Sequence, residues 1–87
     1  MNYIVDWVRT PKKALLAIWL AAPDQAEIAR TANFIERLLT IDPHREGKPI
    51  PRSYRTHFVT PLTVKFKIND ATKTVTIVDV RFGKQPF

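Results

Sequence analysis

The sequence predicts an α+β domain in which an N-terminal strand and an α-helical hairpin pack on an antiparallel β-meander, in the order β-α-α-β-β-β. Three observations predict it. Apolar residues recur at helical spacing in the N-terminal half, they alternate with polar residues in the C-terminal half, and 87 residues suffice for one domain only, spanning residues 1–87. Because the helical and strand patterns occupy separate stretches of the chain, the helices and the sheet are expected to form two layers.

Residues 2–8 are predicted to form a strand because they are rich in β-branched and aromatic side chains. Alternation along that strand places three large side chains on one face: Tyr3, Val5 and Trp7. A helix is expected to follow at once. Thr10 has the hydroxyl that suits an N-cap, and Pro11, which lacks an amide hydrogen, suits the first helical position.

Two apolar stripes predict two helices separated by Pro23. The first stripe consists of Leu15, Ile18, Trp19 and Ala22. The second consists of Ile28, Ala32, Ile35 and Leu39, broadened by Ala29 and Leu38. Asp24 and Glu27 lie at the start of the second helix, where carboxylates suit the positive end of the helix dipole. The two helices are expected to form an antiparallel hairpin that packs its stripes against each other or on a sheet.

The C-terminal half is predicted to contain a loop and a meander. Residues 42–52 hold three prolines and one glycine, which favour a loop. Strands are predicted at residues 53–59, 62–68 and 74–82, with tight turns at residues 60–61 and 69–72. Two apolar residues of the last strand suit one face and three suit the other: Val75 and Ile77, then Val78, Val80 and Phe82. A β-bulge near Val78 and Asp79 would bring both groups to the same face, and bulges often lie beside functional sites.

The net charge of +6 comes entirely from the C-terminal half. Residues 1–43 hold five basic and five acidic side chains, whereas residues 44–87 hold nine basic and three acidic ones. Four of those nine are arginines, whose planar guanidinium group suits phosphate recognition. A charge split of this kind indicates contact with nucleic acid or another anionic partner, although solvated strand faces also favour lysine.

Composition excludes several classes of protein. The absence of cysteine excludes disulfide scaffolds and cysteine-based zinc sites, and two histidines without a carboxylate cluster do not predict a metal site. Two glycines do not make a Gly-rich phosphate loop, so no cofactor is expected. The longest apolar run, residues 14–22, is too short to span a membrane. The N-terminal stretch carries Asp6 and no basic segment, so we expect no signal peptide and a cytosolic protein.

The basic side chains of the C-terminal half supply the candidate site. Arg55 and His57 alternate onto one strand face, and Arg81 is expected near Arg55 if the last strand pairs beside the meander. Such a cluster neutralises a phosphate and stabilises the charge that develops during phosphoryl transfer. The candidate catalytic residues are Arg55, His57, Arg81 and Lys84. The candidate nucleic-acid-binding residues are Arg45, Lys48, Arg52, Lys65 and Lys67.

Structural explanations compete with these assignments. Arg55 could form a surface ion pair with Asp79 across the sheet, and His57, a residue type suited to acid–base chemistry, could be an ordinary strand histidine. Lys65 and Lys67 could line a solvated strand face. Three large aromatic side chains are expected in the core rather than as platforms for base stacking: Trp7, Trp19 and Phe66.

Three stretches of the sequence carry a family resemblance: YIVDWVRTPKKALLAIWLAAPDQ, ARTANFIERLLTIDP and YRTHFVTPLTVKFKINDATKTVTIVDVRF. Together they span nearly the whole chain and resemble the RelE/ParE toxin superfamily of bacterial type II toxin–antitoxin modules. The more specific pieces are RLLTIDP in the second helix, YR at the start of the first meander strand and TVTIVDV in the closing strand. The resemblance implies a small antiparallel sheet packed against an N-terminal helical hairpin.

The resemblance also implies a toxin of the bacterial cytoplasm that an acidic antitoxin holds inactive. In the RelE-like branch, the toxin is an mRNA interferase, an endoribonuclease that cuts mRNA on the ribosome by activating a 2′-hydroxyl against the adjacent phosphate. The family's arginine after the aromatic residue of the second strand matches Arg55. Its basic residue at the end of the last strand matches Arg81, or Lys84 if the bulge shifts the register. Its basic residues before the second strand fall on Lys48 and Arg52.

One departure from the family pattern keeps the activity open. RelE-like ribonucleases commonly carry a tyrosine or histidine near the C-terminus, whereas the terminal aromatic residue here is Phe87, which stacks but cannot transfer a proton. His57 could substitute for it. ParE-like members inhibit DNA gyrase and need no nuclease residues. The sequence therefore leaves three alternatives: an mRNA-cleaving enzyme, a non-enzymatic gyrase inhibitor, and a detoxified relative that binds antitoxin or nucleic acid.

Overall fold

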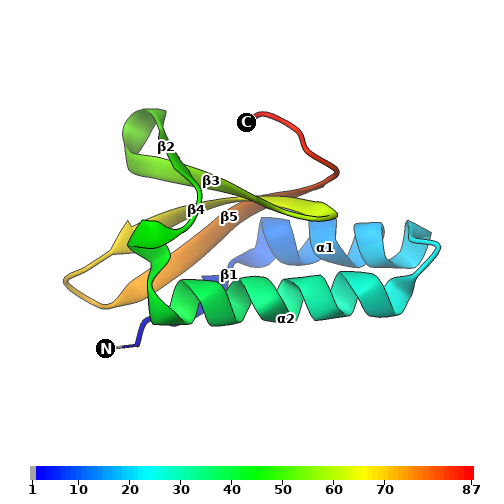
Figure 1. The fold of residues 1–87 in the computed structure, drawn as a ribbon, viewed down its shortest axis with the longest axis horizontal. Helices are drawn as coiled ribbons and strands as arrows, with labels where there is room; N and C mark the ends of the chain where they lie inside the picture. Colours follow the sequence, from blue (N-terminus) through cyan, green and yellow to red (C-terminus); the bar gives the residue numbers. More distant parts are fainter. Residues whose placement is uncertain (1) are drawn as a thin grey trace.

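The computed structural model describes residues 2–87 and has two layers, with two helices on one side of a five-stranded sheet (Figure 1). Its elements are β1 (Ile4–Trp7), α1 (Arg9–Ala21), α2 (Gln25–Ile41), β2 (Lys48–Ile50), β3 (Tyr54–Val59), β4 (Leu62–Asn69) and β5 (Thr74–Phe82). The strand order is β1-β5-β4-β3-β2, with β1 parallel to β5 and all other pairs antiparallel. The predicted α+β class, with a strand and helical hairpin on a meander, is confirmed.

The two helices begin in different ways. Helix α1 starts at Arg9 with Val8 as its N-cap, and no side chain caps it. The prediction of Thr10 as N-cap was therefore wrong, because the chain passes from β1 into the helix without an intervening turn. Pro11 occupies the third helical position, where an amide hydrogen would also lack a helical partner. In helix α2, Glu27 lies in the first turn as predicted, whereas Asp24 precedes the helix as its N-cap and its side chain accepts a hydrogen bond from the Glu27 amide at 3.1 Å.

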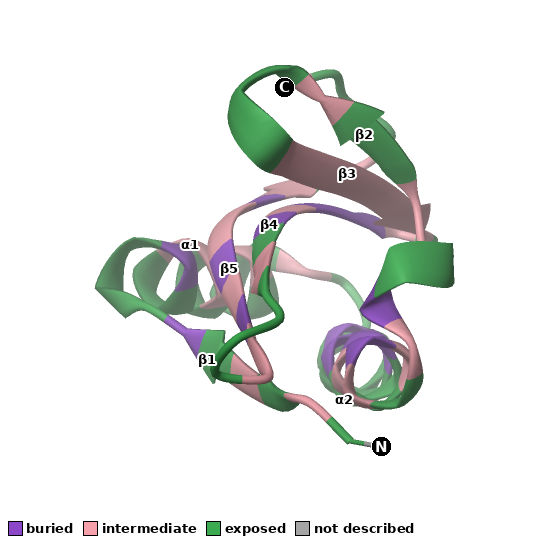
Figure 2. Cartoon of the chain, turned by 90° about the vertical axis from the view of Figure 1, so that its left-hand side faces the viewer, coloured by how far each residue is buried: buried purple, intermediate pink, exposed green. Residues whose placement is uncertain are grey.

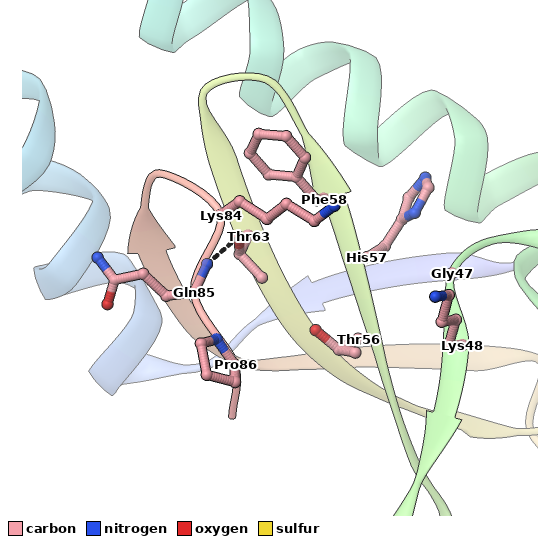
Figure 3. Close-up of a pocket in the computed structure, with 9 residues that line it drawn as sticks. All are labelled: Gly47, Lys48, Thr56, His57, Phe58, Thr63, Lys84, Gln85 and Pro86. Atoms are coloured by element: carbon pink, nitrogen blue, oxygen red, sulfur yellow. Dashed lines mark hydrogen bonds between the residues drawn. The ribbon is translucent and has the colours of Figure 1, made fainter.

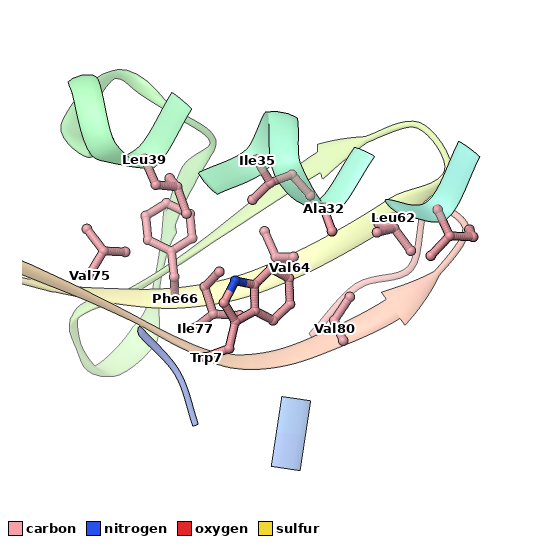
Figure 4. Packing of buried hydrophobic residues seen from close by; sticks show 11 residues of the cluster. Trp7, Ala32, Ile35, Leu39, Leu62, Val64, Phe66, Val75, Ile77 and Val80 are labelled. Carbon is pink, nitrogen blue, oxygen red and sulfur yellow. The ribbon is translucent and has the colours of Figure 1, made fainter. Parts of the chain in front are cut away.

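The hydrophobic core lies between α2 and the helix-side face of the sheet (Figures 2 and 4). It is made by Trp7, Ile28, Ala32, Ile35, Leu39, Leu62, Val64, Phe66, Val75, Ile77 and Val80. The Trp7 indole Nε1 donates a hydrogen bond to Glu36 Oε1 at 2.6 Å, which fixes that ring beneath α2. The predicted core positions of Trp7 and Phe66 are confirmed.

Helix α1 packs on the sheet less deeply than the sequence predicts. Its partly buried stripe consists of Ala14, Leu15, Ile18 and Ala22, and Trp19 stays 37% exposed. The prediction of Trp19 as a core residue was wrong because the residues that pack inward follow the line through Ala14 and Ile18, and Trp19 falls at its margin. On α2, Ala29 is exposed and does not broaden the apolar stripe.

Strand β5 contains the predicted bulge. Phe66 pairs with Ile77 whereas Lys65 pairs with Asp79, so Val78 is the extra residue in the strand. This single insertion places Val80 in the core together with Val75, although the two are an odd number of positions apart.

The stretch predicted as a loop, residues 42–52, contains the short strand β2 between two 3₁₀ turns, Pro43–Arg45 and Pro51–Ser53. The order is therefore β-α-α-β-β-β-β, with one strand more than predicted. Gly47 lets β2 pair closely with β3, because its φ is +69° and a Cβ there would lie 2.1 Å from the Thr56 carbonyl oxygen. A three-residue strand that includes Pro49 is too short to show alternation, which is why the sequence does not reveal it.

Candidate functional site

Strand β3 directs the two residues of the YR pair to opposite faces of the sheet. Arg55 pairs with Phe66 and His57 pairs with Val64 on β4, and both partners are fully buried on the helix side. Directly paired residues of neighbouring strands lie on the same face, so Arg55 and His57 lie on the helix side too. Tyr54 alternates with them and lies on the opposite, open face.

Arg55 and His57 hold the chain segment that precedes β2. The Arg55 guanidinium donates hydrogen bonds to the backbone oxygens of Glu46, His44 and Gly47, at 3.1, 3.1 and 3.3 Å. His57 Nε2 lies 3.3 Å from Glu46 Oε2. The alternative of an Arg55–Asp79 ion pair is therefore wrong, because Asp79 pairs instead with Arg81, at 3.8 Å.

The open face of the sheet carries a group of cationic side chains around an aromatic ring. The Nζ atoms of Lys65 and Lys67 lie 4.4 and 5.4 Å from the centroid of the Tyr54 ring, within the range of cation–π attraction. Strand pairing aligns Lys48, Thr56, Lys65 and Asp79 across four strands. Two residues before Lys65 on β4, Thr63 pairs with Arg81. We call this set the open-face cluster: Lys48, Tyr54, Lys65, Lys67, Arg81 and Lys84.

The C-terminal tail folds back over this face. Thr63 Oγ1 donates to the Gly83 carbonyl oxygen at 2.5 Å and accepts from the Gln85 amide at 3.3 Å. Thr63 is therefore only 3% exposed although it lies on the open face. The Arg81 guanidinium donates to the Pro86 carbonyl oxygen, and its central carbon lies 4.2 Å from the centroid of the Phe87 ring.

A hollow of about 720 Å³ opens between the tail and strands β2 and β3 (Figure 3). It is lined by Gly47, Lys48, Thr56, His57, Phe58, Thr63, Lys84, Gln85 and Pro86. Lys84 reaches across it with its Nζ 5.9 Å from the Phe58 ring centroid. The hollow is of the size that a small ligand or a nucleotide occupies.

The basic residues predicted as site residues do not all lie on one face of the sheet. Five basic residues share the open face with Tyr54: Lys48, Lys65, Lys67, Arg81 and Lys84. Arg55 and His57 lie on the other face, although His57 also borders the hollow, so Arg81 does not lie beside Arg55. Arg45 and Arg52 are exposed in the turns before and after β2.

Four residues of this face were not among the predicted site residues: Tyr54, Thr56, Phe58 and Thr63. Tyr54 could have been found because it precedes Arg55 on an alternating strand. Thr63 could not, because only the folded tail shows its contacts.

A second group of titratable side chains joins three distant segments at the far end of the sheet. Asp70 Oδ1 accepts a hydrogen bond from the Tyr3 hydroxyl at 2.6 Å and lies 2.8 Å from His44 Nε2. Two hydrogen bonds lower the pKa of the Asp70 carboxyl, and the one with His44 has a larger effect than the one with Tyr3. The same bond to Asp70 raises the pKa of the Tyr3 hydroxyl.

Residues 2–87 offer neither a metal site nor a membrane-spanning helix. Among them, no group of three or more His, Asp and Glu side chains is placed to hold a metal ion. None of the helices formed by these residues combines the length and the apolar character needed to cross a bilayer.

Comparison with solved structures identifies the fold. A chain of the toxin–antitoxin complex RelBE2 from Mycobacterium tuberculosis matches with a TM-score of 0.79 and 22% identity, over 94% of this chain and 92% of that one. A chain of the chromosomal ParDE system from P. aeruginosa matches with 0.67 and 15%, over 95% and 98%. The isolated E. coli RelE toxin matches with 0.55 and 10%, over 97% and 87%. No protein-family model and no curated protein matches the sequence. The chain therefore has the fold of RelE and ParE toxins.

Proposed function

We propose that this chain, which has the fold of RelE and ParE toxins, is the toxin of a bacterial type II toxin–antitoxin module. It acts in the cytoplasm as a ribosome-dependent mRNA interferase and is held inactive by an acidic antitoxin. The observation that carries the RNA target is the open-face cluster, in which Lys65 and Lys67 lie over the Tyr54 ring. Three further cations share that face, with Asp79 as the neighbouring carboxylate: Lys48, Arg81 and Lys84. Cations along paired strands neutralise successive phosphates, and an aromatic ring stacks on a base.

The proposed chemistry uses residues of the open face. The RNA 2′-hydroxyl attacks the adjacent phosphorus atom, loses its proton, and displaces the 5′-oxygen, which takes up a proton. Lys65, Lys67 and Arg81 stabilise the negative charge that develops on the phosphate oxygens. The Tyr54 hydroxyl is our candidate for proton transfer, because Phe87 has no group that exchanges a proton. Arg81 must give up its contacts with the tail to reach the phosphate.

Arg55 and His57 have a supporting role in this proposal. Their bonds to the segment before β2 hold Lys48 at the rim of the hollow. Arg45 and Arg52 extend the positive surface at the exposed turns on either side of β2.

Ribosome-dependent mRNA cleavage in a bacterial translation extract tests the enzyme. We expect Arg81→Ala and the double variant Lys65→Ala/Lys67→Ala to lose about 100-fold or more in cleavage rate, and Tyr54→Phe to lose at least 10-fold. Arg30→Ala removes one exposed charge from α2, on the other side of the molecule, and should cleave like the wild type. Cleavage that survives in the open-face variants would contradict the site, and absence of cleavage by the wild type would contradict the activity.

Inhibition of DNA gyrase is the second candidate function. Two observations favour it: Arg55 and His57 are bound to backbone and carboxylate groups away from Arg81, and Phe87 stacks on Arg81 where a proton-transferring residue is expected. A ParE-like toxin needs no catalytic group. A supercoiling assay separates the two functions, because an mRNA interferase leaves gyrase activity unchanged at saturating toxin.

A further inference from the structure

Helix α1 is apolar on all sides over its C-terminal part, yet the fold covers only one of those sides. Residues 14–22 contain no polar side chain. The stripe through Leu15 and Ile18 packs on the core, while Leu16, Trp19 and Leu20 remain 55%, 37% and 63% exposed. A helix that is apolar all round is normally enclosed by other elements. No element formed by residues 2–87 therefore covers the outward side of α1.

A shallow apolar groove continues this surface toward the end of β5. It has a volume of about 390 Å³ and is lined by Ala17, Ile18, Ala21, Ala22, Pro23 and Phe82. Phe82 is 48% exposed, and two alanines face it from the helix. Small residues opposite a large ring leave room for an inserted side chain, as in the anchor pockets of protein interfaces.

The first turns of the same helix are cationic. Arg9, Lys12 and Lys13 are exposed, and none of them forms an ion pair with another residue of the range 2–87. Helix α1 contains no acidic residue, and the positive end of its dipole lies at the same place. The outward face thus has two zones in series, cationic at its start and apolar at its end.

We propose that the outward face of α1 is the docking surface for an acidic, amphipathic helical segment of the antitoxin. Large apolar side chains of that segment cover Leu16, Trp19 and Leu20 and enter the groove beside Phe82, and its carboxylates lie against the cationic zone. Helix α1 is 13 residues long, or about 20 Å, which accommodates three to four turns of a partner helix. The identity of the partner rests on the proposed function, whereas the place and the chemistry of the docking rest on α1.

Charge complementarity favours this occupant over two others. A second copy of the chain would bring cations and no carboxylates of α1 to the cationic zone, which it would leave unpaired. A nucleic acid would leave Leu16 and Leu20 uncovered. An acidic segment with one apolar side satisfies both zones at once.

The test uses the product of the reading frame adjacent to this chain's own, co-expressed with it and then separated from it. Isothermal titration then compares wild type with Leu16→Ser/Leu20→Ser, which removes the apolar zone, and Lys12→Glu/Lys13→Glu, which reverses the cationic zone. Phe34→Ser and Arg30→Glu, at exposed positions of α2, are the matched controls. Thermal unfolding checks that each variant is folded.

We expect the Kd to rise at least 100-fold for the apolar variant and at least 10-fold for the charge variant, with both controls within about twofold of wild type. A larger effect of the charge variant at low salt would support the proposal further. Wild-type affinity in both α1 variants would overturn the docking surface and leave the proposed function standing. A wild-type homodimer that Leu16→Ser/Leu20→Ser dissociates would also overturn it. Failure of the wild type to bind any acidic partner would overturn the proposed function itself.

Discussion

The two faces of the sheet use similar side chains for different purposes. On the helix side, Arg55 and His57 are bound to backbone oxygens and to Glu46. On the open face, Lys65 and Lys67 lie over the Tyr54 ring, and Arg81 over that of Phe87. A strand's alternation therefore decides whether a cation stabilises the fold or remains available to a ligand. Substitutions on the two faces should separate stability from binding.

The largest difference between the faces is expected at neighbouring positions of β4. Phe66 is fully buried, so Phe66→Ala should lower the free energy of unfolding by about 3–5 kcal/mol, because it removes a ring and leaves a cavity. Lys67→Ala, at the next residue on the exposed side, should change it by less than about 0.5 kcal/mol. Urea unfolding followed by tryptophan fluorescence measures both. Equal effects would contradict the assignment of the faces.

The two glycines with positive φ should respond unequally to alanine. Gly47→Ala should cost roughly 2 kcal/mol, because a Cβ would meet the Thr56 carbonyl oxygen and the backbone angle suits glycine. At Gly83 the φ is +82° but no atom lies within 4 Å of the added Cβ, so Gly83→Ala should cost only about 1 kcal/mol. Thermal unfolding of the two variants provides the comparison. A smaller effect at Gly47 would mean that β2 does not pack as described.

Arg55→Ala should destabilise the protein by about 1.5 kcal/mol, because three backbone oxygens lose a charged donor. Arg55→Lys should not restore stability, since one ammonium group cannot reproduce the guanidinium fork. Arg81→Ala should cost about 0.5 kcal/mol or less and should instead weaken RNA binding. Urea unfolding and RNA titration of the three variants test the contrast. A larger loss of unfolding free energy in Arg81→Ala than in Arg55→Ala would contradict this contrast.

Salt dependence of RNA binding tests the open face alone. If Lys65 and Lys67 each contact one phosphate, the double alanine variant should reduce the slope of log K against log[salt] by about 1.4 for single-stranded RNA. Fluorescence anisotropy with a labelled RNA over a range of NaCl concentrations measures the slope. Arg30→Ala is the matched control and should leave it unchanged. An unchanged slope in the lysine variant would place the RNA elsewhere.

The smallest effect is expected from Asp70. Because its pKa is lowered in the folded state by His44 and Tyr3, its contribution is present above the ordinary carboxyl pKa and is lost as pH falls through the lowered value. The raised pKa of the Tyr3 hydroxyl acts at the other end of the scale, since stability is lost as pH rises through it. Asp70→Asn should therefore flatten the acid limb of a melting-temperature profile. A profile identical to that of wild type would show that these bonds do not contribute.

Much of the fold could be predicted because the spacing of apolar residues along the chain indicates which positions are buried. The apolar side chains of β5 change from odd to even positions between Ile77 and Val80, which predicts the bulge. The helical spacing of apolar residues predicts α2. Strand β2 could not be predicted because its pairing depends on Gly47 fitting against the Thr56 backbone, a contact that leaves no periodic pattern. Trp19 was wrongly predicted to lie in the core, because apolar character alone does not distinguish a side chain that the fold covers from one that stays exposed.

The candidate site was harder to predict than the fold. The residues of β3 are all half-buried, and both of its faces carry apolar side chains, Phe58 on one and Val59 on the other. The alternation of β3 therefore does not indicate which face meets the core, and the pairing of Arg55 with Phe66 decides it. The burial of Thr63 depends on the returning tail, which lies outside any strand pattern.

The pairing of β1 with β5 sets the order in which the molecule can be completed. Val5 pairs with Val75, so among residues 2–87 the one strand neighbour of β1 is β5, which is synthesised after every other strand of the sheet. Contacts between residues so far apart form late and slowly. During synthesis, the segment of the two helices is finished well before β1 can join the sheet. The sheet, and the open face with it, is therefore complete only after β5 (Thr74–Phe82) has been synthesised.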